Sequence, residues 1–269
     1  MPAGLGRSCR SPNGVADAVT TEPRSEPRRV TPDLFPACYA LLQATFHAEE
    51  LNTKQQMLAD LTTPADGRPA EEFVMLARRA EAEGRGRQGN AVISLIVGCY
   101  LGLSAPEFAG QSAGFIEYLV TSAAFRQQGH ASAMLAAFEQ EMHRIAQARQ
   151  ERLRLIVGEI EADLVAFKRK RGYRQPAGCR YAQPPIAFDE LTGAPLADAL
   201  PKVLVVNAGN DPVEARLLLD AVRQIFAKRY VPRRASEPAA RHAAAFIHSQ
   251  VYAPFAASLQ TADGIVRLD

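Results

Sequence analysis

The chain has 269 residues, of which 47% are hydrophobic and 22% charged, and its formal net charge is +2 at pH 7. This length and composition predict a globular protein that buries one substantial core or two modest ones. A nearly balanced charge gives no electrostatic basis for wrapping nucleic acid, which normally needs a clustered basic surface, so we expect no nucleic-acid partner.

The first thirty residues carry arginines but no long apolar run, so they do not resemble a secretory signal peptide and are predicted to be a disordered leader, residues 1–30. One charge-free stretch, residues 88–106, is long enough to consider as a membrane segment. Gln, Asn, three glycines and a proline interrupt it. Its apolar part fits a buried strand better than a bilayer span, so we expect no membrane partner.

The four cysteines are far apart, form no CxxC pair and have no nearby histidine at metal-ligand spacing. They are Cys9, Cys38, Cys99 and Cys179. We interpret them as reduced structural thiols and expect no metal site. Reduced thiols favour a cytoplasmic location.

Ordered structure is expected to begin near Thr31, where apolar residues recur at helical spacings after a Thr-Pro start, and a helix or helix pair should reach about Leu61. Two apolar segments, residues 71–80 and 91–104, flank the turn-prone polar segment 81–90. This pattern is typical of two antiparallel strands joined by a hairpin.

A third strand is predicted at residues 113–121, after which the hydrophobic period changes. From Gly129 to about Gln147, apolar side chains mark one face of a helix, and a new apolar run follows at residues 153–160. Strand, helix and strand in this order make a crossover unit, whose two strands should lie parallel in one sheet.

Past the crossover, three elements are expected before residue 207: a short helix within 163–174 and strands near 178–183 and 202–206. The tail is predicted to be helical. Its first helix, within residues 210–226, has Asp211 as the expected N-cap and Pro212 in the first turn. A last helix is expected at residues 238–252.

The junction between the third strand and the next helix reads FRQQGHASAML, residues 125–135. A glycine there lets the backbone approach a ligand closely, and the free N–H groups of a first helical turn attract anions such as phosphate. In crossover units, ligands bind beyond the carboxyl end of the strand. A tight loop with a solvated arginine is the alternative interpretation of these residues.

The longer stretch VTSAAFRQQGHASAML resembles the signature of the GNAT superfamily of acyl-CoA-dependent N-acyltransferases. That signature is Arg or Gln, two variable residues, Gly, one variable residue, and Gly or Ala; Arg126, Gly129 and Ala131 fill its fixed positions. The order of the expected elements over about residues 33–205 is also similar. The resemblance implies an α/β fold with a mixed, mostly antiparallel central sheet, a parallel crossover between its fourth and fifth strands, and flanking helices. We expect this domain at residues 31–206 and a helical C-terminal extension at residues 207–269.

In this family the backbone N–H groups of the motif loop hold the pyrophosphate of coenzyme A. The resemblance gives this role to Gln127, Gln128, Gly129, His130, Ala131 and Ser132, with a charge-assisted contact from Arg126. It also implies that the fourth strand separates from the fifth and pairs with the pantetheine arm through the backbone of Leu119, Val120 and Thr121. The expected co-substrate is acetyl-CoA or another acyl-CoA, and the expected partner is a small-molecule or peptide amine.

Acyl transfer from a thioester to an amine needs a neutral amine, stabilisation of an oxyanion and a proton for the departing thiolate. Glu117, in an otherwise apolar strand, is our first candidate base, because burial raises the pKa of a carboxyl group. Glu159 is the second, with Glu161 on the same face of the next strand. The alternative interpretation of Glu117 is a solvated strand end or an ion pair with a neighbouring basic residue. For Glu159 and Glu161 the alternative is a solvated strand end.

Two positions depart from the family pattern. Many relatives have an asparagine where Glu161 falls, and many have a tyrosine four residues before the closing glycine, where this chain has Lys168. A lysine could contact a phosphate or the thiolate. Tyr173, Tyr181 or water are the alternative proton donors.

The sequence therefore predicts an N-acyltransferase that moves an acyl group, which we take to be acetyl, from acyl-CoA to an amine by direct transfer. The first helices, residues 103–112 and residues 181–188 are expected to line the acceptor pocket. A non-catalytic acyl-CoA-binding or regulatory module and an interaction protein that uses the helical tail are the alternatives. The tail has three open interpretations: a cover over the pocket, a homodimer contact, or plain packing.

Overall fold

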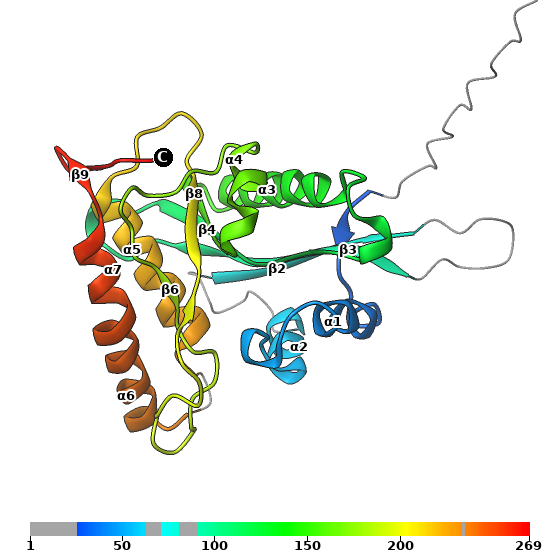
Figure 1. Cartoon of the computed structure of the whole chain (residues 1–269), viewed down its shortest axis with the longest axis horizontal. Helices are drawn as coiled ribbons and strands as arrows, with labels where there is room; N and C mark the ends of the chain where they lie inside the picture. Colours follow the sequence, from blue (N-terminus) through cyan, green and yellow to red (C-terminus); the bar gives the residue numbers. More distant parts are fainter. Residues whose placement is uncertain (1–25, 63–70, 81–90, 233–234) are drawn as a thin grey trace, which may run out of the picture.

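The centre of the structure, a computed structural model that describes residues 26–62, 71–80, 91–232 and 235–269, is a six-stranded sheet of order β1-β2-β3-β4-β5-β8 (Figure 1). Its strands are β1 (Arg28–Arg29), β2 (Glu71–Arg79), β3 (Val92–Gly102), β4 (Gln111–Thr121), β5 (Arg152–Ile160) and β8 (Val203–Asn207). β4 and β5 are parallel and every other neighbouring pair is antiparallel. The predicted fold class is therefore confirmed.

Helices cover both faces of this sheet (Figure 1). One face carries α3 (His130–Ala148) and α4 (Val165–Arg169). The other carries α1 (Phe35–Gln43) and α2 (Lys54–Thr62) at one end, and α5 (Ala215–Ile225), α6 (Glu237–Ile247) and α7 (Ala253–Ser258) at the other. Because both faces are covered, β3 reads as a continuous apolar run in which all but its end residues are buried.

Short elements connect these layers. In the described part of the chain, the 3-10 turns are η1 (Ala48–Glu50), η2 (Pro106–Phe108), η3 (Ala123–Phe125) and η4 (Ala162–Leu164). The π-helical segments there are η5 (Phe226–Tyr230) and η6 (His248–Tyr252). Two small two-stranded sheets pair β6 (Ala182–Gln183) with β7 (Leu200–Pro201), and β9 (Thr261–Ala262) with β10 (Ile265–Val266).

The alternation of side chains along β5 assigns each residue to one face of the sheet. Ile156 and Ile160 pack in the cluster that contains the buried side of α3. Leu155 and Val157 pack in the cluster built on α5 and the rest of the C-terminal extension. Successive β5 residues therefore point to opposite layers, as the pleat of a strand requires.

β4 and β5 part before either strand ends. Their last pair is Ile116 with Gly158, although β4 continues to residue 121. At the same place the β3–β4 register steps from Val97–Tyr118 to Gly98–Ile116, so Glu117 is the extra residue of a β-bulge. A bulge bends its strand and re-aims its side chain. We infer that this bulge turns β4 away from β5.

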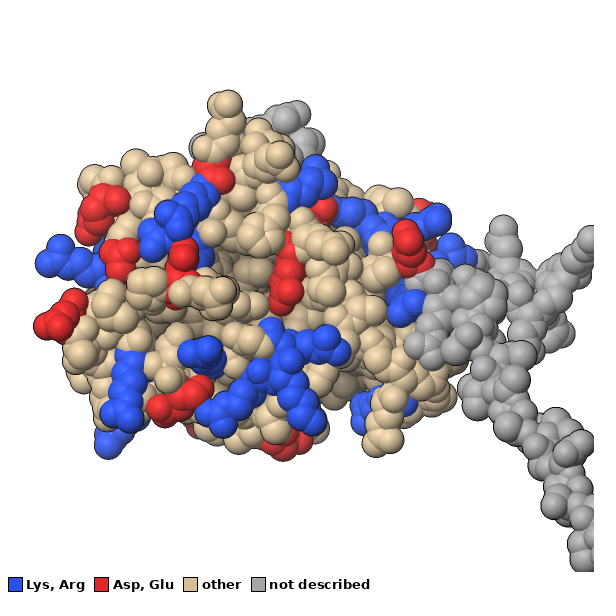
Figure 2. Space-filling model, turned by 90° about the horizontal axis from the view of Figure 1, so that it is seen from above, with Lys and Arg blue, Asp and Glu red and all other residues tan. Residues whose placement is uncertain are grey.

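The surface on the α3 side carries both signs of charge, with Lys and Arg interspersed among Asp and Glu (Figure 2). Among the residues that the structure describes, none of the helices has both the length and the apolar character needed to cross a bilayer.

The hairpin turn at residues 81–90 and most of the leader, residues 1–25, lie outside the described residues, while Arg28 and Arg29 already pair with β2. Of the strand expected near residues 178–183, only Ala182–Gln183 pairs. The hydrogen bond from Arg180 N–H to Ser258 Oγ, 2.8 Å, instead ties the preceding chain to the end of α7.

The expected cap at Asp211 is wrong. The helix begins at Ala215 with Glu214 as its N-cap, because the preceding chain is extended and joins the last segment of the protein. The N–H of Val266 donates to the Val213 carbonyl at 2.8 Å, and Asp211 forms an ion pair with Arg152 at 2.7 Å.

Replacing Gly98 tests the close packing at the bulge. The Cβ of Gly98→Ala would lie 2.0 Å from the carbonyl oxygen of Phe115, where only backbone can move. We expect a loss of about 3 kcal/mol in the free energy of unfolding, the upper part of the usual range for overpacking. Gly158→Ala is the control, since its Cβ meets Val205 at an ordinary 3.5 Å. Equal denaturation midpoints for the two variants would contradict this description of the bulge.

Candidate functional site

A cavity of about 950 Å³ lies where β4 and β5 diverge. Its walls come from β4, β5, the start of α3, the η1 region and the C-terminal extension. It brings together thirteen residues singled out from the sequence: Glu117, Leu119, Val120, Thr121, Arg126, Gln127, Gly129, His130, Ala131, Ser132, Glu159, Glu161 and Lys168. Gln128 is not among the lining residues, and its side-chain amide donates to the Ala124 carbonyl at 3.4 Å.

The loop before α3 presents backbone N–H groups at one end of the cavity. The first hydrogen bond of the helix joins Ala133 N–H to the Gly129 carbonyl at 3.0 Å, so the amides just ahead of Ala133 have no acceptor within the helix. Gln127 and Gly129 both have positive φ, 62° and 82°. Left-handed residues at a helix start form concave nests that bind anions, and the helix dipole adds to the attraction.

Gly129 faces open space, since a Cβ built on it would meet no atom within 4 Å. Beside it, the exposed Arg126 donates from Nε to the Thr121 carbonyl at 3.3 Å. His130 is buried, and its ring packs edge-on against Phe125 with centroids 6.1 Å apart. The loop therefore leaves room for a ligand above its backbone while its own side chains fix its shape.

Beyond the parting point, Leu119, Val120 and Thr121 pair with β3 on one side of β4 only. Their partners there are Ile96, Leu95 and Ser94. The Val120 carbonyl also accepts a hydrogen bond from the Ser94 hydroxyl at 2.8 Å. The other edge of these residues faces the cavity, where β5 no longer follows.

Glu117 lies on the α1–α2 and extension side of the sheet, in an ion pair with Arg229 of η5. Both side chains are almost fully buried, 5% and 4% exposed. Arg229 also donates from Nη2 to Asp60 of α2 at 3.0 Å. The Arg229 guanidinium thus joins the bulge, the N-terminal helices and the extension. The ion pair given as an alternative interpretation of Glu117 is therefore present in the structure.

The Glu159 carboxylate accepts hydrogen bonds from the hydroxyls of Tyr181 and Tyr230. Burial raises the pKa of Glu159 to about 7, although the two phenol hydrogen bonds oppose the shift. The side chain lines the cavity and is not a solvated strand end. A carboxyl group with this pKa can exchange a proton near neutral pH.

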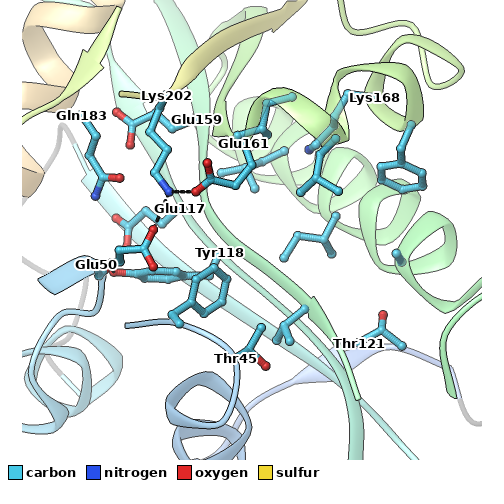
Figure 3. Close-up of a pocket in the computed structure, with 18 of the residues that line it drawn as sticks. Thr45, Glu50, Glu117, Tyr118, Thr121, Glu159, Glu161, Lys168, Gln183 and Lys202 are labelled. Carbon is cyan, nitrogen blue, oxygen red and sulfur yellow. Dashed lines mark hydrogen bonds and ion pairs between the residues drawn. The ribbon is translucent and has the colours of Figure 1, made fainter. Parts of the chain in front are cut away.

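The same end of the cavity holds a lysine between two carboxylates (Figure 3). Lys202 Nζ donates to Glu50 at 2.6 Å and to Glu161. Lys202 directly precedes β8 and Glu161 directly follows β5, and the antiparallel β5–β8 register places them side by side. Glu161 therefore acts in an ion pair at the mouth of the cavity.

Lys168 lines the cavity from α4 and is 2% exposed. Its Nζ finds no hydrogen-bond partner among the described residues and lies 4.6 Å from the centre of the Tyr173 ring. Burial lowers the pKa of Lys168 to about 8, against the opposing effect of Glu139. Tyr173 is not a lining residue, because its hydroxyl donates to Glu139 at 3.0 Å.

The expectation that residues 103–112 line the pocket is wrong for the described cavity. This loop is held elsewhere by Asp220 of α5, whose carboxylate accepts the backbone N–H groups of Ser104 and Ala105 at 2.7 and 3.1 Å. Segment 181–188 contributes Gln183 and Ile186 as expected.

The described cysteines Cys38, Cys99 and Cys179 are free thiols, and Cys9 lies outside the described residues. Over the same described ranges, no group of three or more His, Cys, Asp or Glu side chains is placed to hold a metal ion.

No protein-family profile and no curated protein sequence matches the chain. Solved structures do match. NAA60 of Arabidopsis thaliana in complex with acetyl-CoA superimposes with a TM-score of 0.50 at 11% identity, over 69% of this chain and 98% of that chain. The mostly antiparallel sheet of this chain, its parallel β4–β5 pair and its flanking helices match the GNAT fold. The chain has the GNAT fold.

Two further structures are similar. NAA60 of Arabidopsis thaliana with a bisubstrate analogue has a TM-score of 0.49 at 12% identity, over 68% of this chain and 97% of that one. A Bacteroides thetaiotaomicron protein assigned to the GNAT acetyltransferases has a TM-score of 0.47 at 16% identity, over 77% and 98%. At these identities the likeness concerns the GNAT fold alone.

Four site residues were missed in the sequence of this GNAT-fold chain: Glu50, Lys202, Arg229 and Tyr230. Arg229 and Tyr230 lie on a π-helical segment more than 50 residues beyond the motif helix. The hydrophobic pattern of the sequence does not predict such a segment. The pairing of Lys202 with Glu161 was within reach, because it follows once β8 is placed beside β5.

Removing Arg229 tests whether this guanidinium stabilises the buried Glu117. Arg229→Met leaves a buried carboxylate without its main counter-charge, which we expect to cost about 3–5 kcal/mol of unfolding free energy. Arg229→Met combined with Glu117→Gln should recover part of that loss. Arg241→Met is the control, since it breaks an exposed ion pair with Glu237, worth about 0.5 kcal/mol or less. Denaturant unfolding of the four proteins measures these differences; identical midpoints for Arg229→Met and Arg241→Met would refute the assigned role.

Proposed function

We propose that this protein is an N-acetyltransferase that moves an acetyl group from acetyl-CoA directly to an amine. One observation carries the proposal. A single cavity joins the amide nest at the start of α3, the open edge of β4 and the buried carboxylate of Glu159. NAA60 of Arabidopsis thaliana, which shares the fold, forms a complex with acetyl-CoA, and this agrees with the proposal.

The residues present fit coenzyme A. Amides ahead of Ala133 and the open space over Gly129 suit a diphosphate, to which Arg126 adds a positive charge. The backbone of Leu119, Val120 and Thr121 suits an extended amide-containing arm, since their pairing edge is not used by β5. When bound, acetyl-CoA supplies the activated thioester.

Glu159 is the proposed general base. A pKa of about 7 leaves the carboxyl group partly ionised at neutral pH and basic enough to take a proton from an ammonium group, directly or through water. Tyr181 and Tyr230 orient the carboxylate through their hydroxyls.

Glu117 has a different role in this proposal. Its ion pair with the buried Arg229 occupies its oxygens, so Glu117 does not take the proton and instead forms part of the acidic wall at the acceptor end. The carboxylates of Glu50 and Glu161, next to Lys202, extend this acidic surround at the acceptor end (Figure 3). A small-molecule or peptide amine is the acceptor class that such a surround attracts.

Gly129→Asp tests the amide nest. The new carboxylate would point into the open space over the loop and repel a diphosphate. We expect at least a tenfold weaker affinity for CoA by calorimetry. Gly129→Asn is the matched control, because it introduces the same strain at φ 82° without the charge. Equal affinities for the Asp and Asn variants would count against a phosphate site here.

Thiol release from acetyl-CoA, measured against amino acids, polyamines, aminoglycosides and peptides, tests the proposed activity and its base. We expect turnover to rise with pH through about 7, as Glu159 loses its proton. Glu159→Gln keeps the length of the side chain and one oxygen that can accept from a tyrosine hydroxyl, while its NH2 group can only donate. It should lower kcat/KM by about 100-fold or more and abolish that acidic limb.

Acetyl-CoA binding without turnover across the whole panel would instead support a non-catalytic acyl-CoA-binding module. An unchanged acidic limb in Glu159→Gln would show that another group is the base.

A further inference from the structure

Lys168 is a buried charge that its surroundings compensate only in part. Its Nζ has no hydrogen-bond partner among the described residues, although the residue is only 2% exposed. Leaving a buried charged group unpaired is costly, and native proteins retain such groups mainly where they serve a function. The face of Tyr173 gives Nζ one favourable contact, at 4.6 Å from the ring centre.

The position of this nitrogen in the sheet is defined by Gly158. A Cβ built on Gly158 would lie 3.9 Å from Lys168 Nζ. Gly158 is also the last residue of β5 that pairs with β4. The ammonium group therefore lies at the point where the two strands part, and it lines the cavity there.

Lys168 and Glu159 approach the parting point from opposite faces of the sheet. Gly158 shares the face of Ile156 and Ile160, which pack against α3, so Lys168 lies on the α3 side. Glu159 points the other way, toward Tyr230 of the extension. In Figure 3 Lys168 lies apart from the group formed by Glu117, Glu159 and Lys202. The cavity thus has a cationic donor on the side of the amide nest and a carboxylate on the other.

We propose that Lys168 is a catalytic residue that protonates the leaving sulfur during acyl transfer. This inference rests on the function proposed above. As the amine nitrogen bonds to the acyl carbon, the carbon–sulfur bond breaks and its electron pair stays on sulfur. The Lys168 ammonium gives its proton to that sulfur and becomes a neutral amine, while Glu159 takes the proton lost by the acceptor nitrogen.

The electrostatic surroundings agree with this role. Burial lowers the pKa of Lys168 to about 8, so the group is mainly protonated at neutral pH yet gives up its proton readily. Two groups face it from the elements packed against it: the ring of Tyr173, and Glu139 of α3, whose charge opposes the lowering. Tyr173 itself is engaged with Glu139 and does not compete as donor.

The test compares Lys168→Met with Lys170→Met, an exposed lysine just past α4. Bound CoA is titrated with pH, and the ultraviolet absorbance of its thiolate is followed, so no acceptor is needed. A nearby ammonium favours the thiolate, and we expect the thiol pKa of bound CoA to be about one unit lower in the wild type and Lys170→Met than in Lys168→Met.

Two further measurements separate catalysis from structure and from phosphate binding. Lys168→Met should melt at or above the wild-type temperature, because it removes an unpaired buried charge. It should also bind 3′-phosphoadenosine 5′-diphosphate, which lacks the thiol arm, as tightly as the wild type. With the best acceptor found, kcat should fall by about 100-fold or more and the alkaline limb near pH 8 should disappear.

An identical thiol titration in Lys168→Met and wild type, with CoA bound to both, would overturn the role of Lys168 and leave the acyltransferase proposal standing. Weaker binding of the nucleotide diphosphate to Lys168→Met would overturn it in favour of a phosphate contact. A wild-type protein that does not bind CoA at all would overturn the proposed function itself.

Discussion

The parting of β4 from β5 is the constraint on which the site depends. Two parallel strands that paired to their ends would close the sheet, and the backbone of residues 119–121 would have no free edge. The bulge at Glu117 prevents this, and it is possible only because Gly98 lets β3 approach the Phe115 carbonyl so closely. The missing Cβ of Gly98 on β3 thus permits the bend of the neighbouring strand β4, along whose far edge the cavity lies.

The charged groups at this opening differ in the number of hydrogen-bond and ion-pair partners that the fold gives them. Glu117 has Arg229, and Glu159 has two phenol hydroxyls, so both carboxylates are held in defined positions. Lys168 has the face of Tyr173 and the charge of Glu139, but its Nζ has no hydrogen-bond partner in the described part of the chain. The carboxylates therefore lie on one side of the sheet and the weakly held ammonium on the other, an arrangement that agrees with the separate proton acceptor and proton donor that we propose.

Local signals predicted the crossover, the motif loop and most of the elements well, because hydrophobic period and a glycine before a helix are properties of neighbouring residues. The signals failed where distant segments decide the structure. Asp211 looked like a cap, yet the pairing of Val213 with Val266 moved the helix start. Similarly, an ion pair is one of the two alternative interpretations that the sequence offers for Glu117, but its partner could not be named. Arg229 lies 112 residues away, on a segment whose sequence shows no functional motif.

The π-helical segment η5 carries a consequence for how this protein could diversify. Arg229 and Tyr230 reach the acceptor end from a tail that makes no strand of the six-stranded sheet. Under the proposed function, substitutions in that tail would change the acceptor end of the cavity while the amide nest before α3 stays the same. Selection could then change the tail and the amide nest separately. A tail taken from a different lineage, however, would lack the residues that neutralise Glu117 and orient Glu159.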